Sequence, residues 1–206
     1  MYALVTDNEI TQIITNPKTM VIGDVRYPAK IFQLWSQSEL NAIGIYEVVT
    51  DSSNFKDEKW YINTNESYAF ADNQVTRSWG TATPKAHADT LWTQQDSDDG
   101  DLPDDKEVGD VKVEGLKTKL IRTLKQQVAG ILNDTDWYIT RNTEKSTAIP
   151  SAISTYRDAV RTKQASMETA ITNASDTPAL ETLYTYTTDS DGVQSRPLGE
   201  LPILES

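Results

Sequence analysis

The sequence contains no cysteine and only one histidine among its 206 residues. Without cysteine the chain has no disulfide, no thiolate nucleophile and no cysteine-ligated zinc. A Ser-His-Asp site would have to use His87, which lies among small residues, and no Gly-x-Ser-x-Gly motif accompanies it. We therefore expect no hydrolase site of this kind, and we interpret His87 as a solvent-exposed histidine.

Long apolar runs and clusters of basic residues are also missing. No apolar run approaches the roughly 20 residues that a membrane-spanning helix needs. The first residues, MYALVTDNE, contain no basic segment followed by an apolar core, so we expect no signal peptide. Lysine and arginine number 19 against 31 aspartates and glutamates, which gives a net charge of -12. This balance predicts binding to neither nucleic acid nor an anionic membrane.

Motifs that hold cofactors or phosphates are absent as well. The sequence has no glycine-rich phosphate loop, no zinc-binding helix motif and no dinucleotide fingerprint. We expect a protein without enzymatic activity, and we assign no catalytic residue, no cofactor and no metal ligand. The abundant carboxylates leave one enzymatic alternative open, a glycan hydrolase that uses a pair of them.

A calcium site is a second alternative, because the acidic segment begins like a calcium-binding loop. If Asp96 is position 1 of the loop, Asp98 falls at position 3 and Glu107 at position 12. Position 5 is then Gly100, which offers no side-chain ligand, and position 6 is Asp101, where the loop requires glycine. A hydrated acidic loop is the stronger interpretation, and a calcium-stabilised adhesin stays as an alternative.

The first part of the chain, about residues 1–92, is predicted to be a β-rich module. Alternating apolar and polar residues flank Asp7-Asn8, and a similar pattern flanks Asp72-Asn73. Two such residues between alternating runs predict a β-hairpin in each place. Aromatic residues recur through the second half of this module, as is typical of a small sheet that must cover one face with few side chains.

Further elements of this module are predicted from local signals. Ser36 followed by Glu39 predicts a helix with a capping box, and Gly44 is expected to end it. Strands are expected at residues 45–50 and 59–63, and a short helix is expected after Pro84, through Leu91 and Trp92.

An acidic segment follows, QQDSDDGDLPDDKEVGD at residues 94–110. It holds eight carboxylates and one lysine. Such a run repels itself and buries little apolar surface. We therefore predict a linker at residues 93–111 between two domains.

The remainder is predicted to be a helical hairpin at residues 112–186, followed by an extended tail at 187–206. The leucines at 116, 120 and 124 continue into Val128 as one apolar stripe, with basic residues on the opposite face. A second helix is expected to open at Ile149-Pro150, because proline suits a first helical turn. Its residues expected to face inward are Ile153, Tyr156, Val160, Met167 and Ile171.

The stretch ILNDTDWYITRN, residues 131–142, joins these two helices. Its Thr-Asp-Trp sequence is interpreted as a turn, and Trp137 is expected to be buried as a plug at the open end of the hairpin. On that reading, Trp137→Ala would cost about 3–5 kcal/mol. Asp136 is expected to pair with one of three arginines, Arg141, Arg157 or Arg161.

This combination of residues resembles the C-terminal module of bacteriophage tail assembly chaperones and tail-fibre assembly proteins. That group commonly shows a leucine-ending helix, a T-D-W turn and a Y-R-x-x-[LV]-R helix. Here the matching elements are ILNDTDW at 131–137 and YRDAVR at 156–161, within residues 116–171. LWSQSELNAIGIYEVV and YAFADNQVTRSW are also similar to the small β module of such proteins. The family often has a tryptophan shortly before its Tyr-Arg pair, where this chain has Ser151, Ala152 and Ile153.

The sequence thus predicts an α+β fold, a small antiparallel β module followed by a C-terminal helical hairpin. The resemblance implies a non-enzymatic phage tail protein that binds tail-fibre or baseplate subunits, made in the host cytoplasm and found in the virion. It would be either a structural adaptor that stays in the particle or an assembly factor that leaves, and self-association into a homo-oligomer stays open. The residues expected to maintain the module or bind the partner are Asp136, Trp137, Arg141, Tyr156, Arg157 and Arg161.

Overall fold

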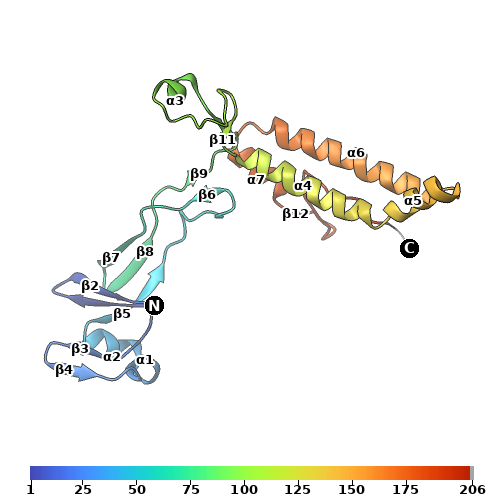
Figure 1. The fold of residues 1–206 in the computed structure, drawn as a ribbon. Helices are drawn as coiled ribbons and strands as arrows, with labels where there is room; N and C mark the ends of the chain where they lie inside the picture. Colours follow the sequence, from blue (N-terminus) through green and yellow to red (C-terminus); the bar gives the residue numbers. More distant parts are fainter. Residues whose placement is uncertain (205–206) are drawn as a thin grey trace. The chain divides into compact units, whose positions relative to one another are not determined.

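The computed structural model describes residues 1–204 and has an α+β fold, which confirms the predicted class (Figure 1). The chain forms two compact units, Met1–Thr83 and Pro84–Ser206. The division therefore lies before the acidic segment, which belongs to the second unit. The sequence predicted a linker in that segment, because its charge does not reveal the contacts that the residues on either side of it make.

The first unit contains a five-stranded sheet with the order β2-β1-β5-β8-β7. Four of the strands form two antiparallel hairpins, and β5 lies between them. β5 is antiparallel to β1 but parallel to β8, with Val48 opposite Val75. The sheet is therefore mixed, with one parallel pairing beside the antiparallel pairings that the sequence analysis predicted. The strands are β1 Tyr2–Thr6, β2 Glu9–Ile14, β5 Ile45–Thr50, β7 Ser67–Ala71 and β8 Gln74–Ser78.

Both predicted hairpins are confirmed, and their turns explain why the sequence signal was strong. Asp7 and Asn8 have φ values of 53° and 63°, and Asp72 and Asn73 have values of 51° and 57°. Two successive residues with positive φ make a turn whose twist matches that of the flanking strands. Aspartate and asparagine tolerate this conformation better than most side chains.

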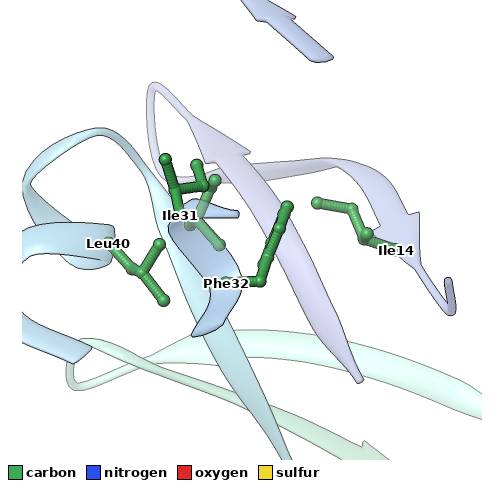
Figure 2. Packing of buried hydrophobic residues seen from close by; sticks show 5 residues of the cluster. Ile14, Ile31, Phe32 and Leu40 are labelled. Carbon is green, nitrogen blue, oxygen red and sulfur yellow. The ribbon is translucent and has the colours of Figure 1, made fainter. Parts of the chain in front are cut away.

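A hydrophobic cluster lies against the sheet and two short helices, α1 at Ile31–Leu34 and α2 at Gln37–Ala42. In the view of Figure 2, the ring of Phe32 lies between Ile31 and Ile14, with Leu40 beside Ile31. Ile45 completes the buried cluster, and a small hairpin of β3 (Met20–Ile22) and β4 (Val25–Tyr27) adds partly buried side chains.

The α2 capping box and the glycine stop are both confirmed. The Ser36 hydroxyl accepts from the Glu39 backbone N–H, while the Glu39 carboxylate accepts from the Ser36 backbone N–H at 2.7 Å. Gly44 has φ 82° and its carbonyl accepts from the Val5 N–H at 2.8 Å. A Cβ atom at Gly44 would lie 2.5 Å from the Val5 carbonyl oxygen, so only glycine fits between α2 and β5. The expected strand at 59–63 is reduced to β6, Tyr61–Ile62, which pairs with β9, Thr83–Pro84.

The short helix expected after Pro84 is absent, and this prediction is wrong. Residues Thr90–Leu91 instead form β10, which pairs with β11 at Val111–Val113. The preceding residues serve as a cap for the long helix: the Asp89 carboxylate accepts from the Gly115 N–H at 2.6 Å and from the Thr118 hydroxyl at 2.7 Å. Within the acidic segment, Thr93 caps a short helix, α3, at Gln94–Asp98.

The two predicted long helices are confirmed as α4, Leu116–Asn133, and α6, Ser151–Asn173, which pack side by side (Figure 1). Their buried residues include Leu124 and Val128 from α4 and Val160 from α6. Tyr156 is only half-buried, so its predicted inward position is not realised fully. A helix that was not predicted, α5 at Asp136–Lys145, occupies the connection. The unit continues with α7, Thr177–Tyr184, and a small hairpin of β12, Thr187–Thr188, and β13, Gln194–Ser195.

Candidate partner-binding site at the junction of α4, α5 and α6

The connection between α4 and α5 is a tight bend centred on Thr135. The Thr135 backbone N–H donates to the Leu132 carbonyl at 3.0 Å, and its hydroxyl donates to the same oxygen at 2.9 Å. Thr135 is 3% exposed, so its hydroxyl is removed from water. These bonds satisfy a carbonyl at the end of α4 that has no partner within the helix, and they turn the chain directly into α5.

Arg157 of α6 fixes this bend from the other side. Its Nη1 donates to the Leu132 carbonyl at 2.8 Å and to the Thr135 hydroxyl, while its Nη2 donates to the Asp136 carboxylate at 2.8 Å. The Arg157 side chain is 7% exposed, whereas that of Asp136 is 54% exposed. A buried cation at the C-terminal end of α4 is also favoured by the partial negative charge of the helix terminus. Arg157 therefore connects all three helices.

The predicted burial of Trp137 is wrong. Trp137 is 48% exposed, because the Thr-Asp-Trp sequence begins a helix rather than forming a turn that points inward. Asp136 is the first residue of α5 and directs its carboxylate to Arg157, and the indole that follows it projects from the helix surface. The hairpin end is closed by the hydrogen bonds of Thr135 and Arg157 instead of an aromatic plug.

Around Trp137 lies an aromatic and cationic cluster on the surface of α5. The Tyr138 ring lies 3.7 Å from the Trp137 ring, centroid to centroid, and the Arg141 guanidinium is 4.8 Å from the centre of the Trp137 ring. Arg141 is half-buried against both rings, and its Nε has no hydrogen-bond partner within the described chain. We call Trp137, Tyr138 and Arg141 the α5 cluster. Tryptophan, tyrosine and arginine are the residues most enriched where binding energy concentrates in protein interfaces.

The other two predicted residues lie on α6 and contribute less to this arrangement. Arg161 is exposed and its guanidinium lies 3.5 Å from the Asp158 carboxylate, one turn away on the same helix. Tyr156 is half-buried beside Arg157 in the sequence. Of the three arginines proposed as partners of Asp136, only Arg157 pairs with it in the described structure.

The sequence analysis missed Tyr138, and it counted Thr135 only as a residue of the turn. Thr135 carried a usable signal, because threonine before an acidic residue often stands at the start of a helix. Treating Asp136 and Trp137 as part of a turn concealed the start of α5. Tyr138 had no distinguishing signal, since its stacking depends on α5 being helical.

The described residues give little support to the two alternatives, a calcium site and a glycan hydrolase. Within residues 1–204 no group of three or more histidine, aspartate or glutamate side chains is arranged to hold a metal ion. The segment Asp189-Ser190-Asp191-Gly192 also begins like a calcium-binding loop, but it has no glutamate at the closing position. Asp189 accepts from the backbone N–H groups of Asp191 and Val193, as in an ordinary turn.

One pocket of about 540 Å³ has two carboxylates among its lining residues, Asp134 and Glu200, as well as Arg196. Burial acts to raise the pKa of Glu200, but hydrogen bonds from Tyr186 and Arg196 outweigh it, so the net pKa of Glu200 is lowered. A glycan hydrolase needs one carboxylic acid with a raised pKa to protonate the leaving group. The pKa of Glu200 is lowered instead of raised.

Comparison with known proteins adds no relative. No family model matches the chain, and no curated protein and no solved structure matches it either. Among the helices of residues 1–204, none is both long and apolar enough to cross a bilayer.

Proposed function

We propose that this chain is a non-enzymatic bacteriophage tail protein that binds a tail-fibre or baseplate subunit through the α5 cluster. The observation that carries the proposal is the display of Trp137, an indole half-exposed on a helix that partly buried hydrogen bonds hold in place. The choice of partner rests on a resemblance: ILNDTDW and YRDAVR are similar to the module of tail-fibre assembly proteins.

The α5 cluster has the physical properties of a binding site. Its aromatic rings offer apolar area without losing many rotamers on binding, and Arg141 rests on them with its direction already limited. The helix that carries the cluster is tied to its neighbours, because Arg157 of α6 donates to Leu132 of α4 and to Asp136 of α5. A partner that covers Trp137 would remove apolar surface from water, which is the main favourable contribution to association.

Binding to purified tail-fibre and baseplate subunits tests this proposal. We expect Trp137→Ala to weaken the complex by about 2 kcal/mol or more, as is typical of a central interface tryptophan. The matched control is Ile139→Ala, because Ile139 is 39% exposed on the same helix but lies two residues along, on the other side. Equal effects of the two variants, or no binding to any tail subunit, would overturn the proposal.

Counting copies of the chain in purified, salt-washed virions separates the two forms of the proposal. A fixed multiple set by the tail's rotational symmetry identifies a structural adaptor. Presence on unassembled fibres in the lysate with absence from particles identifies an assembly factor. Absence from both contradicts a tail function.

A further inference from the structure

The guanidinium of Arg141 is a cation without a counter-ion in the described chain. Among residues 1–204 it contacts the rings of Trp137 and Tyr138, and it forms neither a hydrogen bond nor an ion pair. Arg157 differs in this respect: its Nε also has no partner, but its two Nη atoms donate to three acceptors at the bend. All five N–H donors of Arg141 are therefore without a protein acceptor.

The free donors of Arg141 have a defined position. Its Nε is buried, and a buried N–H group without an acceptor costs free energy. Its two Nη atoms have no hydrogen bond and are not buried, so they have access to solvent. The guanidinium lies 4.8 Å from the centre of the Trp137 ring and 5.6 Å from that of Tyr138, which limits its direction. The planar Nη edge of an arginine held in this way matches a carboxylate, which accepts two parallel hydrogen bonds.

The carboxylates of α5 do not occupy this edge. Asp136 is held by Arg157 at 2.8 Å. Glu144 follows Arg141 by three positions, a spacing at which helical ion pairs form, yet in the described chain the two form none. The helix carries equal numbers of acidic and basic residues. Selection of a ligand therefore rests on the unpaired donors of Arg141 and not on the net charge of the helix.

We propose that the α5 cluster recognises an aspartate or glutamate side chain of its partner, with an apolar residue beside it. The carboxylate would accept from the two Nη atoms of Arg141, and the apolar residue would cover Trp137, which is 48% exposed. This inference rests on the proposed function of the cluster and names the chemistry that the partner must present. Hydrogen bonds between an ionised donor and an ionised acceptor are the stronger kind, so Arg141 would contribute affinity as well as orientation.

An NMR titration of the full chain with two capped tripeptides tests the inference. The probe is Leu-Glu-Leu, and the comparison peptide Leu-Gln-Leu differs by the loss of one charge. The signals to follow are the indole N–H of Trp137 and the Nε–H of Arg141, each assigned by its loss in a variant. We expect the glutamate peptide to shift both signals with at least fivefold higher affinity than the glutamine peptide, and this difference to shrink as salt is raised.

Variants locate the recognition of the carboxylate. Arg141→Gln should weaken binding of the glutamate peptide roughly tenfold and make the two peptides bind alike. Arg141→Lys keeps the charge but loses the paired donors, so its affinity should be intermediate. The matched control is Lys119→Gln, which removes one charge at an exposed position of α4 and should leave the affinity unchanged.

The inference and the proposed function can fail separately. A tail subunit that binds Arg141→Gln as tightly as the unmodified chain, but binds Trp137→Ala more weakly, would overturn the inference and leave the function of the α5 cluster in place. Selective binding of the glutamate peptide, without binding to any tail subunit, would support recognition of a carboxylate and contradict the tail function.

Four other results would overturn the inference. The first is equal binding of the two peptides, and the second is an equal effect of Arg141→Gln and Lys119→Gln. The third is a Trp137 signal that shifts with protein concentration in the absence of peptide, which would make a second copy of the chain the occupant. The fourth is displacement of the glutamate peptide by inorganic phosphate at matched ionic strength, which would assign Arg141 to a phosphate group.

Discussion

The Arg157 guanidinium donates to the Asp136 carboxylate at 2.8 Å, across 21 residues of sequence, and thereby connects the first turn of α5 to α6. The two side chains differ sharply in exposure, 7% for Arg157 and 54% for Asp136. Arg157 is the buried member of this pair, and its guanidinium also donates to the Leu132 carbonyl and the Thr135 hydroxyl. Its position is therefore fixed by more than the carboxylate of Asp136.

Removal of Arg157 should therefore be costly. Arg157→Ala leaves the Thr135 hydroxyl and the Leu132 carbonyl without a charged donor and opens space at the bend. We expect the free energy of unfolding to fall by about 2–4 kcal/mol. Urea unfolding followed by circular dichroism measures this, with Arg161→Ala as the control, because Arg161 is exposed and should change stability by about 0.5 kcal/mol or less. Equal losses in both variants would refute the role given to Arg157.

Trp137→Ala should have little effect on stability. The indole is 48% exposed, so its removal creates no buried cavity, and we expect a change of about 0.5 kcal/mol or less. Leu180→Ala provides the contrast within the same unit: Leu180 is fully buried, and its truncation should cost about 2–5 kcal/mol. Thermal unfolding of the two variants measures the difference. A loss of 3–5 kcal/mol at Trp137 would restore the buried plug that the sequence suggested.

Two glycines of the second unit should respond in opposite directions to alanine. Gly130 lies within α4 with open space where a Cβ would be, so Gly130→Ala should stabilise by roughly 0.5–1 kcal/mol. At Gly115 a Cβ would collide with the Ala88 carbonyl in the segment that caps α4, so Gly115→Ala should destabilise. Differential scanning calorimetry shows the sign of each change. Stabilisation by Gly115→Ala would contradict the close approach at the start of α4.

The acidic segment should lose a specific interaction at low pH. A hydrogen bond from the Lys112 ammonium, followed by those from Thr93, lowers the pKa of Asp96 from 3.8 to about 2. Because the pKa is lowered in the folded state, its stabilising contribution is present above pH 4 and is lost as the pH falls toward 2. Carboxyl NMR shifts measure this titration. We expect Lys112→Met to bring the pKa of Asp96 closer to 3.8, and an unchanged pKa would show that Lys112 is not its principal partner.

Local signals in the sequence were reliable where neighbouring residues determine the structure. The Asp7-Asn8 and Asp72-Asn73 turns, the Ser36 capping box and the Gly44 stop all depend on residues a few positions apart, and all are confirmed. The apolar stripe of α4 was equally clear, because a regular period predicts both the helix and its buried side.

The sequence failed where distant residues decide the structure. The parallel pairing of β5 with β8 has no local signal, since either direction suits the same alternating residues. The region around residues 84–92 became a cap for α4 because Asp89 meets Gly115 and Thr118 across more than twenty positions. Arg157 is buried and pairs with Asp136 at the start of α5, whereas Trp137 is exposed. The sequence therefore identified residues of the candidate site, but it predicted burial for Trp137 instead of Arg157.

The position of β5 has a consequence for how the first unit folds. The β1–β2 and β7–β8 hairpins each close over a few residues and can form early and independently. Backbone pairing joins them through β5, whose Thr50 pairs with Arg77 after a long excursion of the chain, and β2 and β7 also lie in contact. Contacts between residues that are distant along the chain carry a loop-closure cost and form late. The central strand of the sheet, rather than either edge, is therefore expected to set the folding rate of this unit.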